Sequence, residues 1–293
     1  MPLLGAHMSI SGGLDRALYR GKEVGCSVIQ IFTRNTTRWN TKALSPAQVH
    51  AFWRAREETS IETVAAHDSY LINPASPLAE IRRKSFIALF DEMNRAERLG
   101  IPYLVIHPGA HLHEGVDVGI RRVSEMLDRI YDRCGRFRVH LLLETTAGQG
   151  TNLGYRFEHL AEIIEKTDSK ERLGLCLDTC HVFAAGYDFR THEAYMALMK
   201  EFDEIIGLER LKLVHLNDSK RERGMRVDRH EHPGYGKIGK KGISFFLRDS
   251  RLKDLPMLIE TPKGRNEQGI DWDKINLELL KSLMEEKTAD DSV

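Results

Sequence analysis

Side chains that commonly bind metal ions close a series of short apolar runs in this sequence. An apolar run of about four to eight residues, rich in Val, Ile and Leu, is typical of a strand that is buried on both faces. Because the polar residue stands at the same end of nearly every run, we expect these ends to converge on one place. The pattern predicts a metal-binding active site formed by His67, His107, Glu144, Asp178, His215 and Glu260.

Three further residues, His181, Asp228 and His230, bring the candidate ligands to nine. Imidazole nitrogens and carboxylate oxygens are ligands that Zn²⁺ prefers, and a catalytic site leaves one position open for water. Nine ligands exceed the needs of one ion, so the set predicts two or three ions, with Glu144 or Glu260 able to bridge a pair. Asp228 and His230 stand two residues apart in an expected extended loop, so both side chains leave it on the same side.

Each candidate also has an interpretation without a metal. A single His at a strand end is more often a hydrogen-bonded core residue, and a single Glu can cap the following helix. Several carboxylates at an apolar barrel mouth, however, are costly to bury without a compensating cation. Asp178 and His181 straddle a strand end at which the chain turns, so they can serve neighbouring ions.

Other histidines and the cysteines fit the metal pattern less well. Cys176 and Cys180 lack a second cysteine pair, so we interpret them as buried strand thiols. His7 closes a further apolar run, and the sequence leaves open whether it supports a ligand or packs in the mouth of the fold. We interpret the remaining loop histidines as solvated, namely His111, His113 and His232.

Strand and helix patterns alternate along the chain. Eight strands are expected, at 3–8, 28–33, 62–67, 103–108, 139–145, 173–179, 211–217 and 256–261. Ser45-Pro46 is typical of a helix start, and helical periodicity occurs at 78–99, 117–134, 155–166, 193–206 and 271–284. The alternation predicts an α/β fold, a (β/α)8 TIM barrel. A doubly wound open sheet is the rival, but it would gather a site only where its strand order reverses.

The composition describes an ordinary globular protein. Among its 293 residues, 43 are basic and 43 acidic, so no overall field attracts nucleic acid or a membrane, and a polyanion needs a local patch. No apolar stretch approaches the roughly 18–20 residues that cross a bilayer, and the first residues lack the features of a secretory signal. Four cysteines without framework spacing favour reduced thiols and a cytoplasmic protein, nucleoid-associated if bacterial. We expect a single domain over 1–286 and a flexible tail over 287–293.

Seven long motifs occur in order along nearly the whole chain: HDSYLIN (67–73), HPGAH (107–111), ETTAGQGTNLG (144–154), DTCHVFAAGYD (178–188), HLNDSK (215–220), DRHEHPGYGKIG (228–239) and ETP (260–262). Together they resemble the endonuclease IV family of apurinic/apyrimidinic endonucleases (AP endonuclease family 2). The resemblance implies a xylose isomerase-like (β/α)8 barrel that uses three zinc ions to cut duplex DNA on the 5′ side of an abasic site. It also suggests a monomer, with no obligate protein partner and no membrane.

The resemblance assigns the candidate ligands to three ions. The first would be held by His67, His107 and Glu144, the second by Glu144, Asp178, His215 and Glu260, and the third by His181, Asp228 and His230. Glu144 and Glu260 are the predicted catalytic residues. Water acidified by two ions would attack phosphorus in line and leave 3′-hydroxyl and 5′-deoxyribose phosphate ends. Blocked 3′ ends are a second expected substrate, because their removal also hydrolyses a bond at a 3′ oxygen.

DNA must be reached by loops around the same mouth. Cations there can bind the phosphate backbone locally, and a bulky side chain can help to extrude an abasic sugar. The candidate DNA contacts are Arg34, Asn35, Arg38, Tyr70, Leu71, Lys220 and Arg226. The family commonly inserts an Arg from the loop after the second strand, whereas this chain has Thr36 and Thr37 before Arg38, so the intercalating residue is shifted or missing.

Two alternatives remain open at this point. A sugar isomerase or epimerase of the xylose isomerase-like type would explain Glu144, Asp178, His215 and Glu260, but it does not need the Asp228–His230 pair or the cationic loops. A catalytically dead binder of DNA lesions would normally have lost a ligand, and all nine are present. Three tightly held ions favour the nuclease, whereas two exchangeable ions favour the isomerase.

Overall fold

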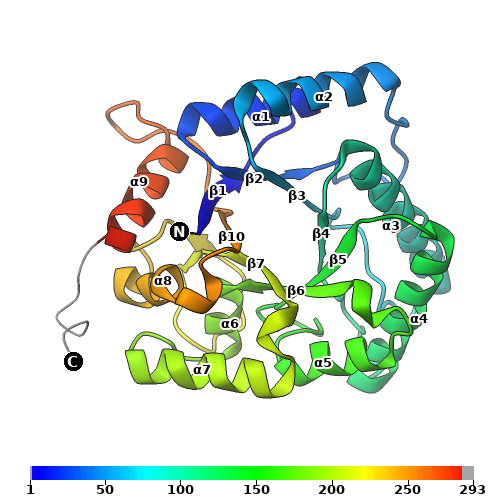
Figure 1. The fold of residues 1–293 in the computed structure, drawn as a ribbon. Helices are drawn as coiled ribbons and strands as arrows, with labels where there is room; N and C mark the ends of the chain where they lie inside the picture. Colours follow the sequence, from blue (N-terminus) through cyan, green and yellow to red (C-terminus); the bar gives the residue numbers. More distant parts are fainter. Residues whose placement is uncertain (1, 286–293) are drawn as a thin grey trace.

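Eight parallel strands close a barrel at the centre of the molecule, as the alternating pattern predicts (Figure 1). The computed structural model describes residues 2–285, so the predicted flexible tail lies outside the described residues. The strands follow one another around the barrel in the order β1-β10-β7-β6-β5-β4-β3-β2, which excludes the open sheet. Their bounds are β1 Leu3–His7, β2 Val28–Phe32, β3 Thr63–His67, β4 Tyr103–Ile106, β5 His140–Glu144, β6 Leu173–Asp178, β7 Leu211–His215 and β10 Pro256–Ile259.

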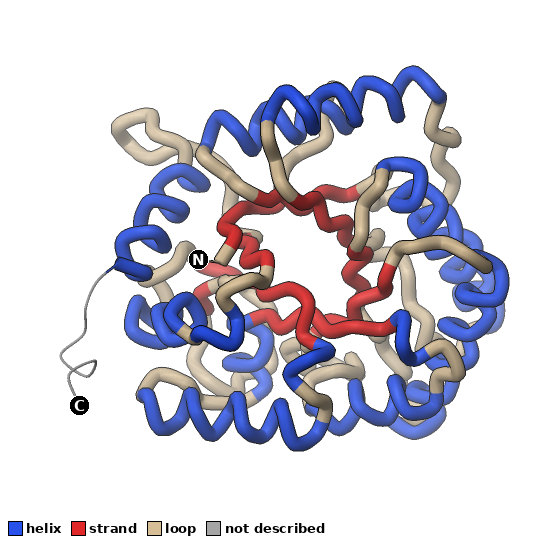
Figure 2. The backbone as a smooth tube through the Cα atoms, viewed as in Figure 1, coloured by secondary structure: helices blue, strands red, loops and turns tan. Residues whose placement is uncertain are grey.

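Helices surround the barrel on the outside (Figure 2). The predicted helices correspond to α2 Pro46–Thr59, α3 Ala79–Leu99, α4 Val116–Cys134, α5 Phe157–Lys166, α7 His192–Ile205 and α9 Trp272–Glu285. Three helices were not predicted: α1 Leu14–Val24, α6 Thr179–Ala185 and α8 Gly239–Arg248. The first and last of these contain an internal glycine, which lowers helix propensity, and α6 has only seven residues. Within residues 2–285, every helix is too short or too polar to cross a membrane.

Local signals set the ends of the predicted helices. Ser45 and Gln48 form a capping box at the start of α2, with Pro46 at the first helical position. The α3 helix ends at Gly100, whose φ of 64° is a left-handed conformation that suits glycine. The capping box sets where α2 begins, and Gly100 sets where α3 ends before β4.

The inside of the barrel is filled by one apolar side chain from each of seven strands. This inner layer consists of Val28, Ala65, Val105, Leu142, Cys176, Leu213 and Leu258. On β1 the corresponding position is Gly5, where an added Cβ would lie 1.6 Å from the carbonyl oxygen of Val28. Only glycine therefore lets β1 approach β2 this closely.

A short antiparallel ribbon stands where the sequence predicts an extended loop. It pairs β8 (Asp218–Ser219) with β9 (His230–Glu231). The Asp218 carboxylate accepts hydrogen bonds from the backbone N–H groups of four residues in the following loop: Gly234, Gly236, Ile238 and Gly239. Asp218 thereby fixes the segment that follows the Asp228–His230 pair.

Candidate metal centre

The strand ends place eight polar side chains on the inner surface of the barrel. Side chains alternate along a strand, so a residue two positions after an inner-layer residue points to the same side. Each member of the inner layer is followed at that spacing by a polar residue, and on β1 the spacing leads from Gly5 to His7. We call these residues the strand-end ring: His7, Gln30, His67, His107, Glu144, Asp178, His215 and Glu260.

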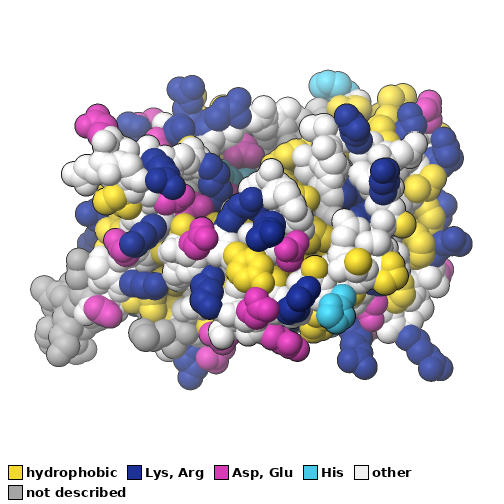
Figure 3. Space-filling model, turned by 90° about the horizontal axis from the view of Figure 1, so that it is seen from above, with side chains coloured by type: hydrophobic (Ala, Val, Ile, Leu, Met, Phe, Trp, Pro, Cys, Tyr) yellow, Lys and Arg dark blue, Asp and Glu magenta, His cyan; other side chains and the backbone are white. Residues whose placement is uncertain are grey.

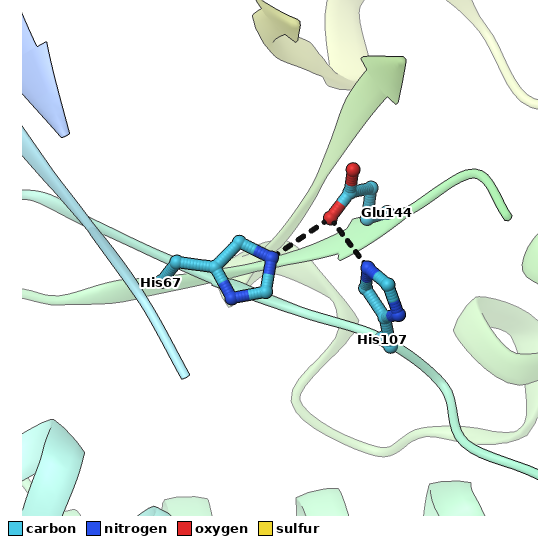
Figure 4. A group of neighbouring side chains, drawn as sticks. All are labelled: His67, His107 and Glu144. Carbon is cyan, nitrogen blue, oxygen red and sulfur yellow. Dashed lines mark hydrogen bonds and ion pairs between the residues drawn. The ribbon is translucent and has the colours of Figure 1, made fainter. Parts of the chain in front are cut away.

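The carboxylate of Glu144 lies at the centre of this ring and is fully buried. Its Oε2 is 3.0 Å from Nε2 of both His67 and His107 (Figure 4). Its Oε1 is 2.9 Å from Nδ1 of His215 and 3.3 Å from Nδ1 of His181. One carboxylate therefore faces four imidazoles, which suits a residue shared between two cations.

A second group shares Glu144 and adds candidate ligands from the ends of three other strands. Nδ1 of His215 is 3.7 Å from Oδ2 of Asp178 and 3.4 Å from Oε2 of Glu260. Ligand atoms of Glu144, Asp178, His215 and Glu260 all lie within 4.8 Å of one another. The structure thus brings together the four residues that the resemblance assigns to one ion.

The third group lies beside the second, at the entrance of the barrel. Asp228 stands between two histidines, with Oδ2 3.2 Å from Nε2 of His181 and Oδ1 3.2 Å from Nε2 of His230. Asp178 reaches the same group, because its Oδ2 is 3.6 Å from Nε2 of His230. The pairing of Asp228 with His230 agrees with the sequence, and the groups are contiguous rather than separate.

The distances between donor atoms fit a shared metal ion. Two tetrahedral ligands of zinc at about 2.0–2.1 Å stand roughly 3.3 Å apart. The pairs described above range from 2.9 to 3.7 Å, and most of them join donor atoms from different strands or loops. Nε2 of His230 is also buried without a hydrogen-bond partner among the described residues. The donor set therefore fits zinc-like ions.

Four of the histidines have one ring nitrogen within hydrogen-bond distance of a carbonyl oxygen, which orients the ring. Nδ1 of His67 lies 3.0 Å from the backbone oxygen of Asp68, and Nδ1 of His181 lies 2.8 Å from that of Thr145. Nδ1 of His230 lies 3.1 Å from the backbone oxygen of Glu260, and Nε2 of His215 lies 2.9 Å from the side-chain oxygen of Gln30. A carbonyl oxygen only accepts, so each of these nitrogens must donate. The opposite nitrogen of each ring faces carboxylate oxygens, where it must carry either a proton or a metal ion. Histidine ligands are typically oriented in this way.

The charges of the buried side chains also indicate that the carboxylates need positive charge beside them. Burial alone would lower the pKa of His67, but its hydrogen bonds to Asp68 and Glu144 raise it well above its usual range. Burial opposes ionisation of Glu144 as well, yet the charges of His215 and His107 hold its pKa well below the usual value. Without an ion, protons on the imidazoles must balance the buried carboxylates, and a bound cation can take their place.

The cysteines and two further histidines lie outside this arrangement or at its margin. Cys176 belongs to the inner layer of the barrel, as a buried strand thiol should, whereas Cys180 lies in α6 rather than in a strand. Burial raises the pKa of Cys180 to about 12, so its thiol is neutral without a bound ion, although its Sγ lies within 4.8 Å of ligand atoms of Asp228 and His230. His113 is exposed as predicted, but the prediction for His232 was wrong: its ring is buried and stacks on Trp272 at 4.1 Å.

A cleft of about 480 Å³ opens above the strand-end ring. Metal-ligand candidates line its floor, and its rim includes Tyr70, Lys220, Arg229 and Lys263. Tyr70 is 74% exposed and its ring contacts Phe32 at 5.3 Å. Elsewhere the surface mixes Lys and Arg with Asp and Glu, as the face in Figure 3 shows, so cations at this rim act locally.

The loop residues predicted to contact DNA fall into two groups. Asn35, Arg38, Lys220 and Arg226 are exposed, and Leu71 is partly buried beside Tyr70. Arg34 differs, because its side chain is only 2% exposed and its guanidinium lies 3.0 Å from Asp91. It also donates to the carbonyl oxygens of Arg38 and Trp39. Arg34 therefore anchors the loop after β2 in this structure and is not presented to the cleft.

Sequence reasoning missed two polar residues that touch the candidate ligands. Gln30 contacts His215 and Glu260, and Asn217 donates to Oδ2 of Asp178 at 2.6 Å. Asn217 Oδ1 also accepts from the backbone N–H of Glu260 at 2.7 Å. The signal for Gln30 was a polar residue inside the apolar run VIQIF, two residues after an inner-layer position.

Comparison with known proteins shows that the chain is similar to one family of barrels in both sequence and structure. The model of the xylose isomerase-like TIM barrel family matches residues 18–283. A probable endonuclease 4 from Chloroflexus aurantiacus is 49% identical over 285 residues, which cover 97% of this chain and 99% of that protein. The crystal structure of endonuclease IV from Thermus thermophilus is 38% identical, with a TM-score of 0.85 over 98% of this chain and 100% of that one. A D-tagatose 3-epimerase-like protein is 19% identical, with a TM-score of 0.74 over 97% of each chain, and this likeness shows the shared fold alone.

Proposed function

The chain belongs to the endonuclease IV family of xylose isomerase-like TIM barrels, and from this membership we propose that it is a zinc-dependent DNA repair enzyme. Its substrate would be duplex DNA that contains an abasic site. It would hydrolyse the phosphodiester on the 5′ side of the lesion and leave 3′-hydroxyl and 5′-deoxyribose phosphate ends. The observation that carries this proposal is the burial of Glu144 among four imidazoles, with two further groups of ligand-type residues beside it.

We assign the nine candidate ligands to three zinc ions in the groups described above. Glu144 would be shared by the first two ions because each of its oxygens faces a different set of histidines. Asp178 would connect the second ion to the third, since its Oδ2 lies near both His215 and His230. When bound, such ions acidify a water molecule and neutralise negative charge on a phosphate.

The protein's own side chains would hold the reacting phosphate within this cleft. His107 is the ligand candidate of the first group that is partly exposed, with a third of its side chain open to the cleft. Glu144 and Glu260 would be the catalytic carboxylates, because both are held ionised by neighbouring imidazoles. Burial opposes ionisation of Glu260, but His215 and His7 lower its pKa.

The rim of the cleft would bind the DNA. Lys220 lines the cleft itself, on the loop between β8 and β9. Arg226 lies on the same loop, and Asn35 and Arg38 lie on the loop after β2, where they line neighbouring hollows. All four residues are exposed. Exposed cations of this kind contact phosphates and give binding a strong salt dependence. Tyr70 would fill the space left by the missing base, because its ring projects at the edge of the cleft next to Phe32.

Blocked 3′ ends would be a second class of substrate for the same site. Removal of a 3′-phosphate or 3′-phosphoglycolate is again hydrolysis at a 3′ oxygen and needs no additional residues. The sugar isomerase alternative, in contrast, gives no role to Asp228, His181 and His230, which form a compact third group here.

Incision of a duplex with one tetrahydrofuran abasic analogue tests this proposal. The analogue cannot undergo β-elimination, so only hydrolysis can cut it. We expect a single nick on the 5′ side that leaves a 3′-hydroxyl, in zinc-loaded protein but not after exhaustive chelation. An intact duplex after incubation with folded, zinc-loaded protein would refute the proposed activity and favour a screen of small carbohydrates.

A further inference from the structure

Two members of the strand-end ring, His7 and Gln30, have no place among the proposed ligands. They come from neighbouring strands and pair in register where β1 meets β2. Gln30 is fully buried, although a glutamine side chain carries two donors and an acceptor that need partners. The groups that contact the Gln30 amide therefore indicate its role.

Gln30 contacts two ligand candidates of the second group at once. Its Nε2 lies 2.6 Å from Oε1 of Glu260, and its Oε1 lies 2.9 Å from Nε2 of His215. The same Nε2 is 3.1 Å from Nδ1 of His7. The amide thus spans from a carboxylate ligand to a histidine ligand on the side away from the cluster.

The chemistry of these partners fixes the orientation of the amide. An ionised Glu260 carboxylate can only accept, so the Gln30 atom beside it must be the NH₂ group. The Gln30 oxygen must then face His215, whose Nε2 has to donate to it. Nδ1 of His215 consequently remains for the carboxylates of Glu144, Asp178 and Glu260, which is the direction in which a metal ion would lie.

Gln30 differs from the groups that orient the other histidines. His67, His181 and His230 each donate to a backbone carbonyl oxygen, which no substitution can remove. Among the carbonyl partners found within residues 2–285, the one that orients His215 belongs to a side chain. The second group is therefore the part of the cluster that depends on a replaceable residue.

We propose that Gln30 is a positioning residue for the second metal subsite. It would select the tautomer of His215 that leaves Nδ1 free to bind the ion, and it would hold the Glu260 carboxylate in position through a hydrogen bond. His7 supports it, because His7 Nδ1 accepts from the Gln30 amide and its ring packs on Phe32 at 4.4 Å. This inference rests on the proposed metal site and adds to it a residue outside the ligand set.

Two substitutions separate the amide's hydrogen bonds from its volume. Gln30→Met keeps the length of the side chain but removes the donor to Glu260 and the acceptor for His215. Gln30→Asn keeps the amide but withdraws it by one methylene, so that it no longer reaches both partners. Ile31→Val is a matched control on the same strand, because the side chain of Ile31 belongs to the apolar cluster shared with the surrounding helices and not to the inner layer of the barrel.

The test measures metal binding directly. Zinc affinities would be determined by competition with a chromogenic chelator, and the cobalt-substituted proteins would be compared by their visible absorption. For both Gln30 variants we expect about 10- to 100-fold weaker binding of one ion, the usual effect of losing a residue that orients a ligand. We also expect a changed cobalt spectrum, and wild-type behaviour for Ile31→Val. If Gln30→Met does not fold, the zinc affinity and cobalt spectrum of Gln30→Asn test the inference.

The possible failures are distinguishable. Folded Gln30 variants whose zinc affinities and cobalt spectra match the wild type would overturn the inference and leave the metal site intact. Wild-type protein that binds no zinc would overturn the metal site and the inference together. Wild-type protein that binds zinc but leaves the abasic duplex intact would refute the proposed activity alone, since the role of Gln30 is measured by metal binding.

Discussion

Substitution of Glu144 by Gln is the perturbation with the largest expected effect for the smallest change in shape. The two side chains have nearly the same volume, but Gln carries no charge and offers only one acceptor oxygen. In the structure both oxygens of Glu144 are engaged, Oε2 with His67 and His107 and Oε1 with His215. The change therefore affects two of the three proposed subsites at once.

The size of the effect follows from that geometry. Loss of a residue that merely orients a ligand costs about 10- to 100-fold in metal affinity or activity. Loss of a direct ligand should cost at least as much at each subsite, so two subsites give about 10²- to 10⁴-fold. At about 1.36 kcal/mol per tenfold, this is roughly 3–5 kcal/mol of transition-state stabilisation.

The assay is single-turnover incision of the tetrahydrofuran duplex with enzyme in excess, alongside zinc content per chain. Excess enzyme removes effects of product release, so the rate reports the chemical step. Glu162→Gln is a matched control, because it makes the same chemical change on the exposed surface of α5. A folded Glu144→Gln variant that incises within a few-fold of the wild-type rate would refute the role given to Glu144.

The remaining predictions concern the loops, the buried acid of α3 and the metal. Arg34→Met removes a buried cation and should lower the free energy of unfolding by about 3 kcal/mol. Arg38→Ala changes an exposed residue, so it should leave the free energy of unfolding unchanged, but it should weaken duplex binding and reduce the slope of log K against log salt concentration by about 1. Equal stabilities of the two variants in denaturant titrations would contradict this. Tyr70→Ala should weaken binding of an abasic duplex by about 1–3 kcal/mol, as lost stacking would, without affecting undamaged DNA; an unchanged Kd for the abasic duplex would exclude a wedge role. Burial raises the pKa of Glu92 to about 8, above the roughly 4.3 of an unfolded chain, so the folded state holds an extra proton between these values and the free energy of unfolding falls as pH rises through that window. Glu92→Gln should flatten this fall, and an identical pH dependence in the variant would show that another group causes it. Zinc binding should release protons from the buried imidazoles, so titration calorimetry in two buffers of different ionisation enthalpy should give different apparent heats, and equal heats would contradict the charge balance described above.

The barrel and the candidate ligands at its strand ends could be predicted from the sequence because both depend on local patterns. Each apolar run predicts a strand, and the polar residue that closes it lies at a fixed spacing from the inner layer. The pairing of Asp228 with His230 was likewise visible as a spacing of two residues. These features need no knowledge of long-range contacts beyond closure of the barrel.

Other features depended on partners that are distant in sequence. Arg34 was expected at the DNA surface, but Asp91 on α3 draws its guanidinium into a buried site, and no local pattern reveals that pairing. Gln30 was overlooked because its role depends on His215 and Glu260, which lie far along the chain. His232 was expected in solvent, but Trp272 on α9 covers it.

Anomalous diffraction at the zinc edge, from crystals of the protein grown with zinc, tests the account's central claim most directly. The claim is that the strand-end ring and the Asp228 loop form one multinuclear metal centre. We expect three anomalous peaks, with one near His67 and His107, one near His215 and Glu260, and one near His181 and His230. Peaks only at surface residues, or a single peak beside Glu144 in zinc-saturated crystals, would contradict the proposed centre.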